Sequence, residues 1–504
     1  MIPDLKFTFH NGFRKLTDYY LENLRYFSFV CCFVVLALNV IPGAAQSTSG
    51  VLQAGAATSN ITPFLDNGIV GNFNSPPAKQ IHDELFAKCL VLDDGTTQIA
   101  IVIVDNLHVN REVLDKAKEI IAQHTPLKKE NILIAATHTH SGTSANGEKL
   151  SGGWNVGKEF DEYQQFFIRR VSDGVRRAIA NKEPAKIAWG SGQVPQHVFN
   201  RRWKMKPGTP MPNPFGGQDK AVMNPGVGNP NLLEPAGPVD PEVSYISIQS
   251  LDNIPIALLA NYSLHYVGGV PMNQISADYF GVFSDRLQQL MNADRQAIPF
   301  VAMMSNGTSG DVNNINFRGP GEKLPAYQKM YKVANDVAQE VFDGYKKLTY
   351  KTNVKLGAAY SELNLEVRKP TPAMLSRAKQ VMADPDNIKL VHPLEKSYAE
   401  RSIKIHEQWP DNIDIVMQVL RIGDVGIAAI PFETFTQTGL DIKAKSPFKP
   451  SFTIELANGS YGYLPTPEQH QLGGYETWLG TNRVEKEAST KISNELMRLF
   501  NTLK

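Results

Sequence analysis

Asn131-Ile-Leu-Ile-Ala-Ala-Thr-His-Thr-His-Ser-Gly142 is an apolar run that turns abruptly into a pair of histidines and a glycine. Its first half, Ile132 to Ala136, is typical of a strand buried on both faces. If the strand geometry persists, His138 and His140 point to the same side, because side chains alternate along a strand. Two such imidazoles beside a glycine turn indicate the rim of a metal or catalytic site. An isolated His-x-His also occurs where the two histidines only form hydrogen bonds with backbone groups. The residues that lie near it in the fold must therefore decide between a structural and a functional role.

The segments around this stretch alternate between strands and helices. Leu85–Leu92 and Gln98–Asp105 predict a hairpin that closes at Asp93-Asp94-Gly95. Helices are predicted over Arg111–His124 and over about 159–181, where apolar residues recur at helical spacing. This succession predicts an α/β fold, with a mixed β-sheet core layered with helices.

Several apolar strands end in a residue that can bind a metal. These residues are His138, His265 at the end of Ile256–His265, and Glu433 just after Pro431. In open α/β sheets, such strand exits converge on one crevice. Two histidines and a carboxylate are a common ligand set for catalytic zinc, which keeps one position open for water.

The composition is that of an ordinary globular protein, with 42% hydrophobic and 20% charged residues among 504. The formal net charge of +1 gives no support for nucleic-acid binding. Of three cysteines, Cys31 and Cys32 lie in the N-terminal segment and only Cys89 lies beyond it. A mature chain with one cysteine has no internal disulfide, so its stability must come from a large core.

The N-terminus carries a targeting segment. Residues 27–41 form an apolar run that follows Arg25 and leads into Pro42-Gly-Ala-Ala45. These are the parts of a secretory signal, which we expect to be cut after Ala45, leaving an exported protein in the periplasm or outside the cell. The segment before the run is long and contains acids, so an uncleaved membrane anchor remains the alternative for residues 1–45.

No boundary divides residues 46–504, which we expect to form one domain. Within it, residues 204–241 are crowded with Pro, Gly and Asn and show no periodicity. A stretch of that length without secondary structure is usually functional or disordered. Two interpretations of this segment remain: a lid over the site, and a loose insertion.

The chain resembles the neutral ceramidases (neutral/alkaline, non-lysosomal) over essentially its mature length. Ordered blocks of sequence carry the resemblance: Thr137-His-Thr-His-Ser-Gly142, Asn200-Arg201, Val239-Asp-Pro-Glu-Val243, His265, Gly310-Asp-Val312, Ile430-Pro-Phe-Glu-Thr434, Tyr463-Leu-Pro-Thr466 and Tyr475-Glu476. The joint order of these blocks is far more specific than any one of them.

The resemblance implies roles for individual residues. It implies zinc ligation by His138, His265, Glu433 and Tyr463, and it places three residues around the bound substrate: His140, Arg201 and Tyr475. Zinc lowers the pKa of bound water and polarises an amide carbonyl. Fixed donors such as Arg201 and Tyr475 can stabilise the tetrahedral oxyanion, and His140 can pass a proton to the departing amine.

The chain departs from the family pattern on the substrate side. Where the family has a serine after Gly310-Asp-Val312, this chain has Asn313, which we count among the residues that act on substrate. The glycine-rich stretch after Gly142 is replaced by Thr143-Ser-Ala-Asn-Gly147. The sequence ends after a final helix, so we expect no C-terminal immunoglobulin-like domain.

Together these features predict an exported zinc-dependent amidohydrolase that cleaves the N-acyl amide of ceramide, or of a ceramide-like lipid, to a fatty acid and a sphingoid base. An alternative keeps the zinc and the fold but takes another amide, an ester or a sugar-derived substrate. A second alternative is a binding protein with a degenerate site. The expected partner is a lipid or small-molecule N-acyl amide, with contact to a membrane surface and no nucleic acid.

Overall fold

The computed structural model describes residues 50–71, 75–146, 157, 159–384 and 386–504. The signal peptide or anchor expected over residues 1–45 lies outside them. Val51–Lys504 form one compact unit. None of the helices in the described part of the chain is long and apolar enough to span a bilayer.

An eight-stranded sheet supplies the two strands that the site histidines follow. In spatial order its strands are β14 (Val301–Asn306), β12 (Pro255–Tyr262), β11 (Glu242–Ser250), β6 (Glu183–Gln193), β1 (Gln53–Asn60), β3 (Phe86–Asp93), β4 (Gln98–Val104) and β5 (Ile132–Ala136). The predicted hairpin is confirmed, with Asp93 opposite Gln98 in the antiparallel pair β3/β4. The pairs β4/β5 and β12/β14 are parallel and the others antiparallel, so the sheet is mixed, as the sequence predicts.

A second sheet stacks on the first. Its strands are β16 (Leu356–Glu366), β17 (Asn412–Ile422), β18 (Val425–Ile430) and β20 (Ser451–Glu455). One buried cluster joins alternate side chains of both sheets, among them Ile101 and Leu133 from the first and Leu420 and Ile454 from the second. Because side chains alternate along a strand, each sheet gives one apolar face to this shared core.

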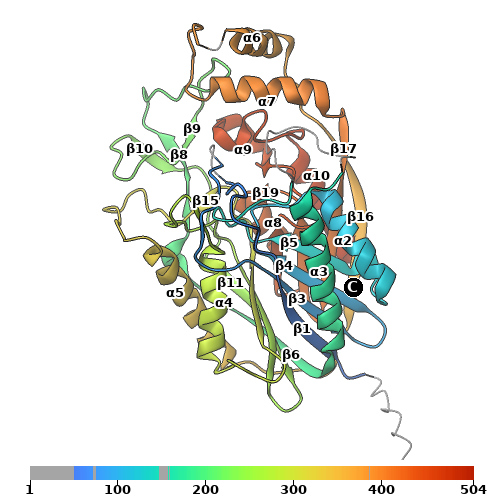
Figure 1. Ribbon diagram of the computed structural model, residues 1–504. Coiled ribbons are helices and arrows are strands. Elements are labelled where there is room, and N and C mark those ends of the chain that lie inside the picture. The colour runs from blue at the N-terminus through green and yellow to red at the C-terminus, as the bar shows by residue number, and fades with distance from the viewer. Residues whose placement is uncertain (1–49, 72–74, 147–156, 158, 385) are drawn as a thin grey trace, which may run out of the picture. The chain divides into compact units, whose positions relative to one another are not determined.

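Helices cover the outer faces of both sheets, which completes an α/β/β/α arrangement. On the larger sheet, α2 (Arg111–His124) and α3 (Glu162–Ala180) cover one half, and α4 (Asp278–Leu290) and α5 (Gln328–Tyr345) cover the other; Figure 1 shows the two pairs apart. On the smaller sheet lie α8 (Thr436–Lys445) and α10 (Ala488–Thr502). The bounds of α2 match the prediction, and α3 starts at a capping box formed by Asp161 and Gln164.

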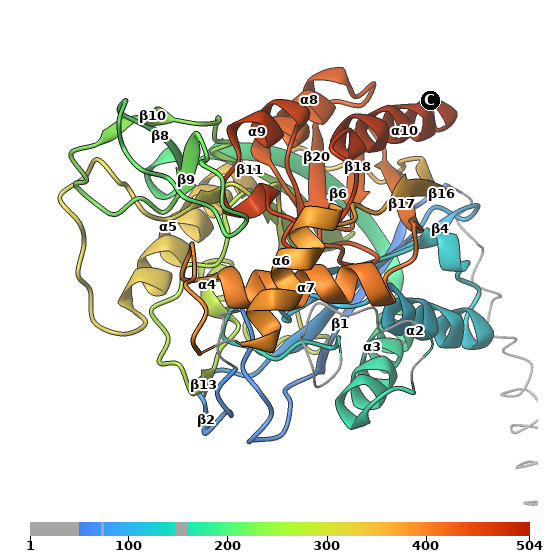
Figure 2. The ribbon, with the colours of Figure 1, turned by 90° about the horizontal axis from the view of Figure 1, so that it is seen from above.

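Two further helices, α6 (Pro372–Ala383) and α7 (Glu395–Gln408), pack on each other. In the view of Figure 1 they lie above α9 (Pro467–Leu472), and they cross the middle of the view in Figure 2. This pair brings Tyr398 and Trp478 together, with their ring centroids 5.2 Å apart. It therefore borders the segment that carries Tyr475.

Residues 204–241 contain regular structure that the sequence does not reveal. The strand β8 (Arg202–Met205) pairs on one side with β9 (Ala221–Met223) and on the other with β10 (Leu232–Pro235). Strands of three or four residues are too short to show a period, and here an adjoining strand supplies their hydrogen-bond partners. The expectation of a stretch without secondary structure is therefore wrong.

Short two-residue pairs complete the fold near the histidines. They are β2 (Gln80–Ile81) with β13 (Gln274–Ile275), β7 (Phe199–Asn200) with β15 (Val312–Asn313), and β19 (Glu433–Thr434) with β21 (Tyr463–Leu464). The last pair sets Glu433 directly opposite Tyr463.

Candidate metal centre

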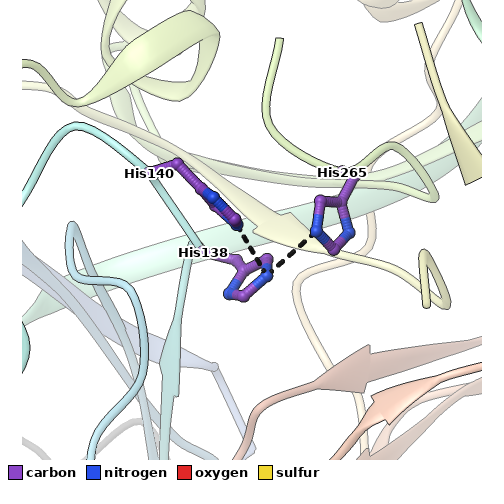
Figure 3. A group of neighbouring side chains, drawn as sticks. All are labelled: His138, His140 and His265. Atoms are coloured by element: carbon purple, nitrogen blue, oxygen red, sulfur yellow. Dashed lines mark hydrogen bonds between the residues drawn. The ribbon is translucent and has the colours of Figure 1, made fainter. Parts of the chain in front are cut away.

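Three histidines meet where β5 and β12 end (Figure 3). The Nε2 atom of His138 lies 3.1 Å from that of His265 and 3.2 Å from that of His140. His138 and His265 are buried, with 2% and 1% of their surface exposed. The sequence-based expectation that His138 and His140 share a site with His265 therefore agrees with the geometry.

Strand alternation is not the reason that the first two histidines converge. β5 ends at Ala136, and His138 has a φ of +71°, in the left-handed region that non-glycine residues rarely occupy. The backbone N–H of His138 donates to the carbonyl oxygen of Asn106, which holds this conformation. Backbone strain of this kind is concentrated at functional sites.

Neighbouring carbonyl groups fix the tautomers of His138 and His265. Nδ1 of His138 donates to the carbonyl oxygen of Leu107 at 2.8 Å, and Nδ1 of His265 donates to that of Ser309 at 3.1 Å. In the neutral rings both Nε2 atoms therefore carry a lone pair and no proton. Two lone pairs that face each other at 3.1 Å repel unless a cation lies between them.

Glu433 adds an anionic oxygen to this pair. Its Oε2 lies 3.3 Å from Nε2 of His138 and 3.9 Å from Nε2 of His265. The same oxygen is buried and accepts no hydrogen bond. Burial opposes a charge here, but His138, the Tyr463 hydroxyl and Arg201 together hold the pKa of the carboxyl below its ordinary value.

These three atoms fit a zinc ligand set. Tetrahedral zinc with bonds of about 2.0–2.2 Å separates its ligand atoms by about 3.3–3.6 Å. The separations among His138 Nε2, His265 Nε2 and Glu433 Oε2 are 3.1, 3.3 and 3.9 Å. The carbonyl groups behind both rings are the outer partners that orient metal-binding histidines.

Sheet twist and sheet stacking bring the three ligands together. Six steps separate β12 from β5 in the large sheet, and five of those pairings are antiparallel. A twist of about 20–25° per step accumulates to roughly 120–150°, which turns the carboxyl ends of the two strands toward the same side. Glu433 follows β18 and so comes from the second sheet.

Tyr463, the fourth ligand implied by the resemblance, lies beside Glu433. Its hydroxyl donates to the Glu433 carboxylate, and burial raises its pKa well above the ordinary value, so the phenol keeps its proton in this arrangement. The ring is 8% exposed and packs edge-on against Tyr475, with centroids 6.0 Å apart. Tyr463 thus lies next to Glu433, one of the three converging residues.

Arg201 is held rigidly on the other side of Tyr463. Its Nε donates to Glu476 at 3.0 Å and its Nη2 donates to the carbonyl oxygen of Gly310 at 2.9 Å. The guanidinium carbon lies 5.3 Å from the Tyr463 ring centroid. Arg202, fully buried, shares the Glu476 carboxylate, so this acid is doubly compensated and Arg201 keeps its charge close to the histidines.

His140 lies between the ring of Tyr266 and Gly71. Its imidazole stacks on Tyr266, with centroids 3.7 Å apart and an angle of 15° between the planes. A Cβ on Gly71, whose φ is +117°, would lie 2.6 Å from the His140 ring, so only glycine fits there. Burial and the charges of His138 and Arg201 lower the pKa of His140 well below its usual value, which leaves the ring neutral.

Both the nitrogen and the oxygen of the Asn313 side-chain amide form hydrogen bonds within the protein. Its Nδ2 donates to Oδ1 of Asn224 at 2.8 Å, and its Oδ1 accepts from the backbone N–H of Ile315 at 3.0 Å. Asn224 belongs to the segment 204–241. Asn313 thus ties that segment to β15 and closes a turn.

Sequence reasoning missed the network behind His265. Glu455, at the end of β20, is fully buried and accepts hydrogen bonds from the Ser309 hydroxyl at 2.6 Å and from the Thr434 backbone N–H at 2.7 Å. Ser309 in turn bonds the His265 ring. The available signal was a single acid inside the apolar run Phe452-Thr-Ile-Glu-Leu456.

Comparisons with known proteins agree with this architecture. A family model described as neutral/alkaline non-lysosomal ceramidase, N-terminal, matches residues 53–323, more than half of the chain. Among solved structures, neutral ceramidase from Pseudomonas aeruginosa superimposes with a TM-score of 0.63 at 17% identity, over 90% of this chain and 74% of that one. A second solved structure, a ceramidase complexed with C2, superimposes with a TM-score of 0.63 at 16% identity, over 90% of this chain and 75% of that one. At these identities the likeness to the solved structures shows a shared fold.

Proposed function

The chain belongs to the neutral/alkaline non-lysosomal ceramidase family, and we propose that it is a zinc-dependent amidohydrolase that cleaves the N-acyl amide of ceramide or of a ceramide-like lipid. The products are a fatty acid and a sphingoid base. We further propose that the enzyme acts after export, as its N-terminal segment suggests.

One observation carries the zinc proposal. Two imidazole nitrogens without protons and one unpartnered carboxylate oxygen, from His138, His265 and Glu433, lie within 3.9 Å of one another in a buried place. Such a group is costly unless a cation neutralises it. With Tyr463 it would hold zinc, which when bound polarises the amide carbonyl and lowers the pKa of a water molecule.

Other residues of the chain would orient the amide and move protons. Arg201, fixed by Glu476 and the Gly310 carbonyl, keeps N–H groups available for the developing oxyanion. The Tyr475 phenol, whose pKa burial raises, stays protonated and can donate to the same oxygen. His140, whose Nε2 lies 3.2 Å from that of His138, would pass a proton to the departing nitrogen.

The acyl chain would run along Phe215, which belongs to the segment 204–241. This ring packs edge-on against Tyr398, with centroids 5.9 Å apart. Met205 and Met211 of the same segment instead pack with Trp203 and Phe317 in a small core of their own. Phe215 packs against the core of the smaller sheet but is only partly buried, and we assign its remaining exposed surface to the acyl chain.

The test is direct. Purified protein loaded with zinc is incubated with a short-chain ceramide, and the fatty acid and the sphingoid base are both quantified. We expect equimolar products, no turnover after chelation, and recovery on adding zinc back. A protein that binds one zinc and hydrolyses none of a panel of N-acyl amides would contradict the proposal.

A further inference from the structure

The two residues that contact the His140 ring each belong to a segment that carries an exposed apolar side chain. Gly71 lies against the ring and Tyr266 stacks on it. Before Gly71 in the chain, Phe64 is 68% exposed, and after Tyr266, Met272 is 74% exposed. These are the two highest exposed fractions among the large hydrophobic side chains of the described residues. Both apolar side chains therefore belong to segments that contact the candidate site.

A third segment joins these two through backbone hydrogen bonds. In it, Ala78 accepts from the Asp66 N–H at 2.8 Å, and the Lys79 N–H donates to the carbonyl oxygen of Asn273 at 2.8 Å. The strand β2 of this segment also pairs with β13, and the two strands lie at the lower edge of the view in Figure 2. We call the three segments together the outer ribbon: residues 64–69, 76–81 and 272–275.

The residues that follow the outer ribbon are bonded directly to the histidine segment. The N–H of Val70 donates to the carbonyl oxygen of Gly142 at 3.0 Å, and the N–H of Ser276 donates to that of Ser141 at 2.8 Å. The carbonyl oxygen of Ser276 in turn accepts from the Thr139 hydroxyl at 2.8 Å. The outer ribbon therefore lies beside the candidate metal centre.

The polar side chains of the outer ribbon bond one another. Asp66 and Lys79 form an exposed ion pair at 2.6 Å, and Gln274 donates to Gln80 at 2.7 Å. With this one acid and this one base, the ribbon carries no net charge. It carries two further exposed apolar side chains, Leu65 and Ile81. Apolar side chains that gather on an exposed surface without net charge are typical of contact with an apolar partner, not with a polyanion.

We propose that the outer ribbon docks the enzyme on a lipid bilayer, with Phe64 and Met272 inserted among the lipids. This inference rests on the proposed function, because a substrate with long acyl chains resides in a bilayer and must pass from it to the metal centre. A ribbon without net charge fits neutral and zwitterionic lipids, whereas anionic bilayers are recognised by clusters of Lys and Arg. The bonds to Ser141 and Gly142 then hold the bilayer surface next to the site where the amide is cleaved.

Vesicle binding tests the proposal. Val51–Lys504 form one compact unit, so chains that begin at residue 46 keep this fold and remove the apolar run 27–41 as a second membrane contact. The probe is a phosphatidylcholine vesicle without ceramide, which separates binding from hydrolysis. The wild type should float with the vesicles, and Phe64→Ser/Met272→Ser should bind them about tenfold or more weakly. Phe64→Leu/Met272→Leu keeps apolar side chains and should recover most of the binding.

A second pair of exposed apolar side chains provides the matched control. Leu251 and Ile254 are 47% and 52% exposed and lie in the turn between β11 and β12. Since β12 runs from that turn toward His265, the turn lies about 25 Å from the end of the strand that the site follows. Leu251→Ser/Ile254→Ser should therefore bind vesicles as the wild type does.

Two substrates separate docking from chemistry. On a long-chain ceramide in phosphatidylcholine vesicles, Phe64→Ser/Met272→Ser should be about tenfold slower at low vesicle concentration. On a short-chain N-acyl amide dissolved in buffer, its kcat/KM should stay within about twofold of the wild type, because the metal centre is unchanged.

The outcomes distinguish the docking surface from the proposed function. Equal vesicle binding by the wild type and Phe64→Ser/Met272→Ser, or no binding by the wild type, would overturn the docking surface and leave the amidohydrolase function standing. Equal loss in the control variant would also overturn it, because any exposed apolar pair would then suffice. Vesicle binding that depends on Phe64 and Met272, without hydrolysis of any amide, would support the docking surface and count against the proposed function.

A second copy of the chain is the competing occupant of the outer ribbon. Sedimentation velocity measures it on the same proteins without vesicles. A wild-type dimer that dissociates in Phe64→Ser/Met272→Ser, together with no vesicle binding, would assign the ribbon to self-association and overturn the bilayer. A monomer that binds vesicles supports the proposal.

Discussion

Among the histidines of the described residues, His138 and His265 are the two whose Nδ1 atoms bond backbone carbonyls. This bond fixes the tautomer in which each Nε2 is free to bind a metal. His392, in contrast, accepts from the Leu394 backbone N–H through Nδ1, in the turn just before α7. The partner of Nδ1 thus separates ligands from structural histidines.

The first prediction concerns these ligands. His138→Ala and His265→Ala should each abolish activity and lower zinc content from one per chain toward zero, because each removes one of the three converging donors. Elemental analysis and thermal unfolding measure metal and fold on the same samples. The control is His124→Ala at the exposed end of α2. A double His138→Ala, His265→Ala variant that still bound one zinc would contradict the assignment of these histidines as zinc ligands.

The second prediction separates ligands from groups that act on the transition state. His140→Ala and Arg201→Ala should keep zinc and lose kcat by about a hundredfold or more. Arg201→Ala leaves Arg202 to neutralise Glu476, so the fold should persist. If instead KM rises while kcat is preserved, these residues only hold substrate. Loss of zinc in His140→Ala would make His140 a ligand.

The third prediction concerns Asn313, which bonds Asn224 in the segment 204–241. Asn313→Ser has too short a side chain to keep that bond, so it should release the segment that carries Phe215. We expect a shift in the ratio of kcat/KM between ceramide and simpler N-acyl amides. An unchanged ratio would show that Asn313 only closes the turn at Ile315, and specificity would then lie elsewhere in the segment.

At the scale of elements, the site depends on a two-residue parallel pair. β19 and β21 set Glu433 opposite Tyr463, and Gly462 makes the approach possible: its φ is +97°, and an added Cβ would lie 2.4 Å from the carbonyl oxygen of Thr481. Neither strand is long enough to show a pattern in sequence. The pairing is fixed by the segments on either side of it.

The fourth prediction follows from this pair. Gly462→Ala should weaken zinc binding and activity together, because relieving the clash moves Tyr463 and with it the Glu433 carboxylate. Gly208→Ala is the matched control: its φ is +85° with open space around it, so it bears only the conformational cost of about 1 kcal/mol or more. Titration with a zinc chelator compares the zinc affinity of the two variants. Equal zinc affinity in both variants would show that the pair tolerates the shift.

At the scale of the molecule, the site lies where two stacked sheets present their strand ends, and the apolar cores lie elsewhere. The four large buried clusters contain none of the proposed zinc ligands. Cys89, the one described cysteine, is free and buried, so no disulfide supports the described part of the chain. The hydrophobic layers must therefore carry the stability.

The fifth prediction is that the fold survives removal of the metal. After chelation, circular dichroism should be unchanged and thermal unfolding should stay cooperative, with a midpoint lowered by a few degrees because bound zinc stabilises only the folded state. Activity should vanish and return on adding zinc. Loss of cooperative unfolding after chelation would show that the metal holds the two sheets together.

The sequence by itself determined the elements and most members of the site. The apolar run before His138, the spacing of α2 and the β3/β4 hairpin are local patterns, and the order of the blocks around His138, His265, Glu433 and Tyr463 pointed to one family. Local signals of this kind depend on residues a few positions apart. They gave no sign of β9 and β10, whose partner strand supplies the order.

Only the tertiary structure decided how these residues meet. The left-handed conformation of His138, the Leu107 and Ser309 carbonyls behind the two rings, and the Glu433 oxygen 3.3 Å from His138 arise from contacts between distant segments. Hydrogen bonds and charges act over a few ångströms in space, whatever the separation along the chain, so sequence spacing alone cannot specify them.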